Sequence, residues 1–575
     1  MSHRIHNPAF RLRSLLLAAG FIAAGCVLVG RAVYLQVLDN GFLKGQGRAR
    51  HVHVVSIPAH RGMIVDRNGD PLAISTPVDS VWVNPQQIGG HPAAIRRLAS
   101  LVDEGAAGLR KRVQAKSGRE FMYVRRQLPP YKAHHIADKG LPGVYLQREY
   151  RRYYPTGEVG AHVIGFTNID DAGQDGLELA FNQWLTGHPG RKRVIKDRLG
   201  QTIDDLGQLR EPRPGKELVL SLDRRIQYLA YRALKEAVVK HRASSGSVVV
   251  LNPDTGEILA MADQPGFNPN NRADLKPSLY RNRAVTDVFE PGSTFKPFII
   301  AAALQNGTVH RGEEFHTSPG WYMLQGHTIK DDADYGTLDL TGILAHSSNV
   351  GASKIALKLK PKYMWNALED FGFGRVTASG FPGERTGHLE YYARWQPIRQ
   401  ATIAFGYGVS VTALQLAHAY AVLADNGVRR PVTFLKVDQP PPGHRVIAAK
   451  TAREVRKMLT AVVKDGTGTR AAIPGYTVAG KTGTAHKFTG SGYSKKKYTA
   501  VFAGMVPAKH PRLVAVVVIN DPKGKQYFGG LVAAPVFRQV MAGAVRLLDI
   551  APDDLPDRSR QAAGPGQPPR TQGVG

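Results

Sequence analysis

The chain has 575 residues, of which 43% are hydrophobic, so it is too long for one compact core and at least two soluble domains are expected. Lysine and arginine exceed aspartate and glutamate by 76 to 46; this balance favours anionic partners such as membrane surfaces, pyrophosphate-bearing lipids or nucleic acid, although a solvated arginine-rich surface gives it too. The single cysteine, Cys26, excludes an intrachain disulfide and a multi-cysteine zinc site, and no clustered histidine spacing predicts a metal centre.

An apolar segment near the N-terminus has the length of a transmembrane helix. Residues Ser14 to Gly30 carry no charge, and the apolar character continues to Leu38, which exceeds the roughly 20 residues that span a bilayer. We therefore predict an anchor over residues 14–38, with residues 1–13 in the cytoplasm and the rest of the chain translocated. This orientation follows from cations before the segment, although others follow it and weaken the inference. These cations are Arg4, Arg11 and Arg13 before it, and Lys44, Arg48 and Arg50 after it.

Two other interpretations of this segment compete with an uncleaved anchor. A cleaved signal peptide is disfavoured because no small-x-small site ends the apolar stretch. Lipoprotein processing is suggested by Ala24-Gly25-Cys26, which resembles the end of a lipobox. The apolar run continues past Cys26, however, where a polar linker is expected, so the uncleaved anchor is the preferred prediction.

The rest of the chain divides by its texture into two predicted domains and a tail. Residues 39–215 are polar, short-stranded and rich in turns, without a catalytic constellation, which indicates a strand-rich pedestal or interaction module. Residues 216–552 have strand candidates near both ends and helix candidates such as Ala413–Ala424 between them, which predicts an α+β domain with one mainly antiparallel sheet covered by helices. Residues 553–575 are rich in Pro, Gly, Gln and Arg and predict a disordered tail.

One four-residue pattern supplies a nucleophile and a base. Pro291-Gly292 predicts a turn before an apolar run, which places Ser293 at the start of a helix. Residues i and i+3 share a helix face, so the Lys296 amine is expected beside the Ser293 hydroxyl. A lysine serves as the base that a serine nucleophile needs if burial or neighbouring cations lower its pKa. The N–H groups of a helix N-terminus also favour the negative charge of a tetrahedral intermediate.

The Ser-x-x-Lys pattern alone also describes an N-cap serine followed by a solvated lysine. Two further motifs that follow it in a fixed order strengthen the catalytic interpretation. Ser347-Ser348-Asn349 comes next, and Lys481-Thr482-Gly483-Thr484 follows a strand candidate at Tyr476–Ala479. This trio characterises penicillin-binding proteins and serine β-lactamases. The chain closely resembles the division-specific class B penicillin-binding proteins, the septal peptidoglycan D,D-transpeptidases. Four further segments carry the resemblance along nearly the whole chain: Arg61–Gly69, RRYYPTGEVGAHVIGFTNID from Arg151, Gly176–Glu178, and FGYGVSVTALQLA from Phe405.

The resemblance implies a role for each residue of the first two motifs. Ser293 attacks the penultimate D-alanine carbonyl of a donor stem peptide, and Lys296 accepts the serine proton. Ser347 relays a proton to the leaving amine. Asn349 holds the substrate peptide and helps to orient Lys296.

The third motif is implied to bind the substrate. Lys481 supplies positive potential, and Thr482 and Thr484, with Gly483 between them, bind the terminal carboxylate. The backbone N–H groups of Ser293 and Thr484 form the oxyanion hole. Release of D-alanine leaves an acyl-enzyme that an acceptor amine resolves as a cross-link, and β-lactams acylate the same serine. Such an enzyme needs no metal, nucleotide or other cofactor.

The resemblance also implies surroundings for this chemistry. Residues 39–215 correspond to a penicillin-binding protein dimerisation-type pedestal, and residues 216–552 to a transpeptidase domain of the penicillin-binding and serine β-lactamase-like fold. The expected location is the inner membrane, with a single span and a periplasmic catalytic domain. The expected partners are peptidoglycan stem peptides, lipid-linked precursor strands, β-lactams, a membrane-embedded septal glycan polymerase and other division proteins, but no nucleic acid or nucleotide.

A phosphate-binding loop is a competing interpretation of the third motif. Residues Gly475 to Thr482 formally match the pattern G-x-x-x-x-G-K-[ST]. A phosphate loop must open a helix whose N-terminus faces the phosphates. The glycine-rich and lysine-rich stretch that follows predicts no such helix, so a nucleotide-binding enzyme is disfavoured.

Three more functions are compatible with parts of the sequence. An elongation-type transpeptidase has the same motifs, and the septal type is preferred from matches around Arg151 and Phe289. A D,D-carboxypeptidase or β-lactamase differs only in activating water to deacylate the enzyme. A binding-only role places the function in the region before Glu217, and replacement of Ser293 would then leave that function intact.

Overall fold

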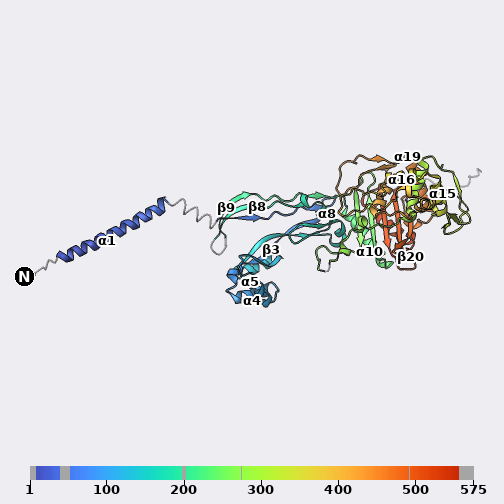
Figure 1. The fold of residues 1–575 in the computed structure, drawn as a ribbon. Coiled ribbons are helices and arrows are strands. Elements are labelled where there is room, and N and C mark those ends of the chain that lie inside the picture. The colour runs from blue at the N-terminus through green and yellow to red at the C-terminus, as the bar shows by residue number, and fades with distance from the viewer. Residues whose placement is uncertain (1–7, 39–51, 197–201, 274, 491, 556–575) are drawn as a thin grey trace, which may run out of the picture. The chain divides into compact units, whose positions relative to one another are not determined.

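The computed structural model describes residues 8–38, 52–196, 202–273, 275–490 and 492–555 (Figure 1). The predictions for the first seven residues, for the cations after the anchor and for the tail from residue 556 onward lie outside these ranges. Contacts divide the chain into two compact units, which we describe separately. The first comprises Met1–His60, Pro77–Tyr150 and Gly187–Pro214, and the second comprises Arg61–Thr76, Arg151–Thr186 and Gly215–Gly575. The predicted domain boundaries stay predictions.

The predicted anchor is helical. Helix α1 (Pro8–Val33) continues into a π-helical turn, η1 (Tyr34–Leu38). Residues Leu12–Val37 have a mean hydropathy of 2.1, and no part of this stretch is buried against the rest of the protein. By length and composition this helix can cross a membrane.

The first unit combines strands with small helices. One antiparallel sheet has the order β1-β8-β9. Elsewhere in the unit, strand β4 pairs with the C-terminal part of β3, and apolar residues of both strands pack against helices α3 to α6. The elements are β1 (Val52–Ile57), β3 (Pro71–Val83), α3 (Pro85–Ile88), α4 (Pro92–Leu101), α5 (Ala106–Ala115), β4 (Met122–Leu128), α6 (Pro130–Ala137), β5 (Val144–Tyr153), β8 (Gly190–Lys196) and β9 (Thr202–Arg210).

The second unit is built on one five-stranded antiparallel sheet of order β12-β11-β21-β20-β19. Alternate residues of a strand face opposite sides of a sheet, and here both sides are apolar. In β11, for example, Val248 and Val250 lie in one hydrophobic core, whereas Val249 and Leu251 lie in the other. The strands are β11 (Ser245–Leu251), β12 (Ile258–Gln264), β19 (Ala479–Thr489), β20 (Gly492–Val506) and β21 (Leu513–Asn520).

Helices cover both faces of this sheet, as Figure 1 shows around β20, and the α+β prediction is confirmed. Helices α10 and α21 pack on one face, and α13, α18 and α19 on the other. These helices are α10 (Arg224–Lys240), α13 (Lys296–Gln305), α18 (Ala413–Ala424), α19 (Ala449–Lys464) and α21 (Ala534–Leu547). The other helices are α7 (Ala161–Ile164), α8 (Gly176–Ala180), α9 (Asn182–Leu185), α11 (Pro277–Tyr280), α12 (Arg283–Thr286), α14 (Leu340–Ala345), α15 (Asn349–Lys358), α16 (Pro361–Asp370), α17 (Pro397–Ile403) and α20 (Gly529–Val532).

Short strands and 3₁₀ turns complete the second unit. The strands are β2 (Ile64–Val65), β6 (Phe166–Thr167), β7 (Gly173–Asp175), β10 (Leu218–Val219), β13 (Glu314–His316), β14 (Trp321–Leu324), β15 (His327–Lys330), β16 (Thr337–Asp339), β17 (Val428–Arg429) and β18 (His444–Arg445). The turns are η2 (Gly157–Val159), η3 (Gly292–Phe295), η4 (Tyr392–Arg394) and η5 (Thr469–Ala471).

One strand prediction was wrong. The strand expected at Tyr476–Ala479 begins only at Ala479 and continues as β19 through the whole Lys481 motif to Thr489. The stretch after Ala479 is polar and lacks the apolar pattern from which a strand is predicted. Its backbone pairs with β20 in register, for example Lys481 with Ala503, and this hydrogen bonding does not depend on apolar side chains.

A buried ion cluster joins three of the segments that carried the sequence resemblance. Glu178 Oε2 accepts a hydrogen bond from Arg61 Nε at 2.6 Å, and its Oε1 accepts one from Arg152 Nε at 2.6 Å. All three side chains are at most 1% exposed. Buried charges persist only when they are paired, so these segments are tied together inside the second unit.

Candidate active site

The predicted nucleophile, Ser293, lies directly before the buried helix α13. The residues of this helix from Lys296 to Ala303 are all buried, and Pro297 lies in its first turn, where no backbone N–H is needed. Ser293 lies in the 3₁₀ turn η3 directly before the helix rather than within it. The Lys296 Nζ atom is 3.0 Å from Ser293 Oγ, as the spacing predicted.

The second motif meets the first at the N-terminus of α15. Asn349 Oδ1 accepts a hydrogen bond from Lys296 Nζ at 2.8 Å, and Ser347 Oγ lies 3.2 Å from the same amine. The Ser347 carbonyl oxygen accepts another bond from it. Ser347 has a φ of +62°, a conformation that few residues other than glycine adopt. This backbone turns both its carbonyl and its hydroxyl toward the lysine.

The third motif forms the opposite side of the site on β19. Lys481 Nζ lies 2.9 Å from Ser347 Oγ, so this one hydroxyl contacts both lysines. Thr482 Oγ1 lies 2.8 Å from Thr467 Oγ1, and Thr484 Oγ1 accepts a hydrogen bond from the Gly529 N–H at 3.0 Å. The strand is at the edge of the sheet, so one side of its backbone is not paired with another strand.

Glycines allow three segments to approach closely at the nucleophile. A Cβ atom on Gly483 would lie 2.7 Å from the Pro291 carbonyl oxygen, so β19 reaches η3 only without a side chain there. A Cβ atom on Gly406 would lie 2.2 Å from the Gly292 carbonyl oxygen. The Thr484 nitrogen is 3.5 Å from the position that a Cβ atom of Gly292 would take. The predicted oxyanion-hole residues, Ser293 and Thr484, thus lie next to each other.

Burial lowers the pKa of both lysines. Lys296 is fully buried, and this lowers its pKa to about 7, against the opposing charges of Asp331 and Asp332. Burial and then the charge of Lys296 lower the pKa of Lys481 well below its usual value, while Asp332 opposes the shift. An amine that is partly neutral near pH 7 can accept the proton of a serine hydroxyl.

Two residues that the sequence analysis missed hold the second motif in place. Asp331 accepts hydrogen bonds from the Ser348 hydroxyl and from the N–H groups of Asn349 and Val350. The Lys330 carbonyl oxygen accepts a bond from Asn349 Nδ2 at 2.8 Å. The only sequence signal was an adjacent pair of aspartates, which matches no known motif.

All eight predicted site residues therefore lie together in the second unit. Ser293, Lys296, Ser347, Asn349 and Lys481 form one hydrogen-bonded chain. The predicted substrate-binding residues, Thr482, Gly483 and Thr484, continue from Lys481 along β19. The glycine-rich match that ends at Thr482 leads into this strand and not into a helix, which is contrary to the geometry of a phosphate loop. Among the described residues, no group of three or more His, Cys, Asp or Glu side chains could hold a metal ion.

Comparison with family models gives two matches. Residues 246–542 match the penicillin binding protein transpeptidase domain. The chain belongs to this family. Residues 56–220 match the penicillin-binding protein dimerisation domain.

Relatives match along almost the whole chain. The probable peptidoglycan D,D-transpeptidase PbpC of Pseudomonas aeruginosa is 44% identical over 95% of this chain and 97% of its own length. The peptidoglycan D,D-transpeptidase FtsI of Escherichia coli K12 is 44% identical over 96% of this chain and 94% of its own length. The transpeptidase domain of Burkholderia pseudomallei penicillin-binding protein 3 is 43% identical, covers 58% of this chain and 98% of its own, and superposes with a TM-score of 0.55. The N-terminal apolar helix fits a membrane-anchored member of the family.

Proposed function

We propose that the protein is a peptidoglycan D,D-transpeptidase that cross-links stem peptides at the division septum. The observation that carries the proposal is the buried amine of Lys296, 3.0 Å from the Ser293 hydroxyl oxygen and with its pKa lowered to about 7. Such an amine can take the hydroxyl proton at neutral pH and so activate the serine. The names of the relatives support peptide cross-linking as the acyl transfer.

In the first half-reaction, Ser293 Oγ attacks the penultimate D-alanine carbonyl carbon and Lys296 takes the hydroxyl proton. The N–H groups of Ser293 and Thr484 stabilise the negative oxygen of the tetrahedral intermediate. Ser347, whose Oγ lies 3.2 Å from Lys296 Nζ and 2.9 Å from Lys481 Nζ, relays the proton from Lys296 to the leaving amine. The peptide C–N bond breaks, D-alanine leaves, and an ester on Ser293 remains.

In the second half-reaction, the amine of an acceptor stem peptide attacks the ester. Lys296 takes the amine proton and returns it to Ser293 Oγ, so the ester C–O bond breaks, Ser293 leaves as its hydroxyl, and a new peptide bond joins the two strands. Thr482 and Thr484 bind the terminal carboxylate of the donor during the first half-reaction, and Asn349 holds the peptide. A β-lactam acylates Ser293 in the same way and leaves an ester that no acceptor resolves.

The proposal includes the predicted surroundings of the site. Residues 1–13 are cytoplasmic, residues 14–38 span the inner membrane, and the pedestal (39–215) and transpeptidase domain (216–552) are periplasmic. Lipid-linked precursor strands and a membrane-embedded septal glycan polymerase are the proposed partners. The 44% identity to FtsI of E. coli supports the septal role over elongation. Depletion of the protein should produce filaments; rounded cells would favour an elongation-type transpeptidase.

Mass spectrometry of the intact protein after penicillin treatment tests the site. We expect one adduct on Ser293 and none in a Ser293→Ala variant that unfolds at the same temperature as the wild type. An adduct on any other residue contradicts the assignment. A donor thioester mixed with an acceptor amine then separates the activities, because a transpeptidase forms the amide, whereas a carboxypeptidase or β-lactamase yields mainly the hydrolysed acid.

A further inference from the structure

The second unit has a cavity of about 760 Å³ between helices α10 and α21 and the turn η2. Helices α10 and α21 pack on one face of the five-stranded sheet, whereas α13, which directly follows Ser293, packs on the other. The cavity is therefore separate from the proposed active site. Cavities that bind small molecules have volumes of about 300–1,000 Å³, so this one is large enough for such a ligand.

The lining of this cavity is largely apolar. A Cβ atom on Gly543 would lie 2.4 Å from Leu229 Cδ1, so α10 and α21 are in close contact where they line it. The Tyr228 side chain, which is 50% exposed, extends the lining on α10, and Leu547 extends it on α21. Val159 lines the cavity from η2. A ligand that covers these side chains removes apolar surface from water, and this favours its binding.

One of the three arginines in the lining differs from the other two. Arg224 forms an ion pair with Asp70 at 3.3 Å, and Arg225 forms one with Asp223 at 2.8 Å. The guanidinium group of Arg546, in the last turn of α21, has no ion-pair or hydrogen-bond partner among the residues that the structure describes. It can therefore donate hydrogen bonds to an anion without losing a partner in the protein.

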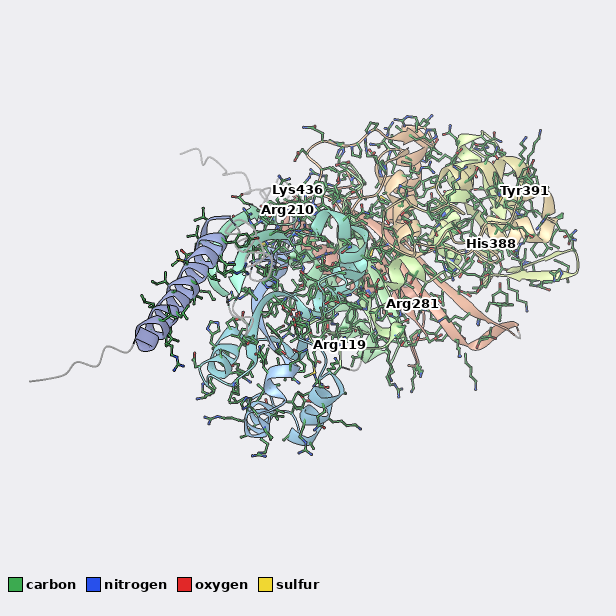
Figure 2. The ribbon with its side chains drawn as sticks, turned by 60° about the vertical axis from the view of Figure 1, so that its left-hand side comes forward. Arg119, Arg210, Arg281, His388, Tyr391 and Lys436 are labelled. Atoms are coloured by element: carbon green, nitrogen blue, oxygen red, sulfur yellow. The ribbon has the colours of Figure 1, made fainter. Side chains whose placement is uncertain are left out.

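An exposed cation alone does not indicate a binding site in this chain. Lysine and arginine number 76, and Arg119, Arg281 and Lys436, labelled in Figure 2, are exposed examples. None of these three residues lines the cavity. Arg546 differs because it combines an unpaired charge with an apolar cavity, which is the pattern of a small-molecule site with one polar contact that fixes the ligand.

We propose that this cavity binds a small molecule in which an apolar body carries a single carboxylate or sulfonate group. Arg546 binds the anionic group, and the apolar body contacts Tyr228, Leu229 and Leu547. The one unpaired cation matches a ligand with one negative charge. The volume favours a small molecule over a folded protein partner, which needs a much larger interface.

The test uses para-trifluoromethyl-phenylacetate as the probe and the full-length protein in nanodiscs, with protein-free nanodiscs as the blank. A fluorine NMR titration should show saturable binding with a Kd of about 1 mM, as expected for so small a ligand. The matching amide, para-trifluoromethyl-phenylacetamide, has the same apolar body without the charge. It should bind about 3- to 10-fold more weakly than the acid.

Variants of the lining separate the charge from the apolar contacts. In Arg546→Gln the acid should bind as weakly as the amide, whereas Arg546→Lys should keep most of the preference. Arg538→Gln is the matched control, because Arg538 is exposed on the same helix outside the cavity, and both Kd values should stay within about twofold. Tyr228→Ala should weaken the acid and the amide equally, by about threefold or more.

The proposal is refuted if the wild type shows no saturable binding, if it binds the amide as tightly as the acid, or if the preference survives Arg546→Gln. A variant that does not fold leaves the decision to the wild-type comparison of acid with amide. The probe could also bind through its carboxylate at Thr482 and Thr484, so the titration is repeated after penicillin treatment. An unchanged Kd supports the cavity, and loss of binding places the probe at Ser293 and overturns the proposal. If penicillin forms no adduct, the proposed function fails, and the comparison of Arg546→Gln with Arg538→Gln decides the cavity.

Discussion

The adjacent aspartates 331 and 332 allow hydrogen bonding and charge to be separated at one site. Both charges oppose the lowering of the Lys296 pKa, but only Asp331 accepts hydrogen bonds from the N-terminus of α15. Asp331→Asn keeps a single oxygen acceptor for three donors. Losing one hydrogen bond to a charged group costs about 1.5–3 kcal/mol, so acylation at high pH should slow by about 10- to 100-fold if the loss displaces Asn349.

Asp332→Asn is the matched control because the described side chains make no hydrogen bond to Asp332. It should retain the acylation rate at high pH within about twofold. In both variants the loss of a negative charge lowers the pKa of Lys296 below about 7, so the rise of rate with pH moves to lower pH. Stopped-flow acylation by a chromogenic β-lactam from pH 5 to 9 measures the plateau and the midpoint. Equal plateaus in the two variants would refute the positioning role of Asp331.

Three further results are expected. Wild-type acylation should rise with pH through about 7, since Lys296 acts as a base only when deprotonated, and a flat profile between pH 6 and 8 would contradict this. Gly483→Ala should lower the acylation rate by more than about 100-fold because its Cβ atom would clash with the Pro291 carbonyl oxygen, whereas Gly490→Ala, whose Cβ atom would have nothing within 4 Å, should not. Equal rates in the two variants would contradict the close approach of β19 to η3. Glu178→Gln, in the buried cluster with Arg61 and Arg152, should lower the free energy of unfolding in urea by about 3–5 kcal/mol, whereas Asp254→Asn, at the exposed pair with Arg512, should lower it by under about 1 kcal/mol. Similar losses in the two variants would show that the buried cluster contributes little stability.

The catalytic pair could be predicted from the sequence because its geometry is local. Ser293 and Lys296 are three residues apart at the start of a helical segment, and helical periodicity alone brings their side chains together. The meeting of Ser347 and Lys481 with that pair is different. These residues lie on separate elements, and only the resemblance to a known family indicated that they share one site.

Features that depend on how distant segments pack together could not be predicted from the sequence. Asp331 reaches α15 through the path of the hairpin that precedes it, and no spacing rule connects a carboxylate to a helix N-terminus 18 residues on. The length of β19 was missed because its polar, glycine-containing sequence carries no apolar strand pattern, although pairing with β20 depends on the backbone. The role of Gly406 could not be predicted either, because a side chain at this position is excluded only by the nearby carbonyl oxygen of Gly292, which is distant in the sequence.

The two lysines resolve an apparent conflict in the proposed reaction, which needs a neutral amine at Lys296 and a cation at Lys481. Burial lowers the pKa of both, and the charge of Lys296 lowers that of Lys481 further, so the two amines do not readily hold two charges at once. A substrate carboxylate at Thr482 and Thr484 lies near Lys481 and favours its charged form. A bound carboxylate would therefore favour a proton on Lys481 over one on Lys296, and a neutral Lys296 is the form that accepts the proton of Ser293. The substrate would then itself favour the protonation state in which the serine reacts.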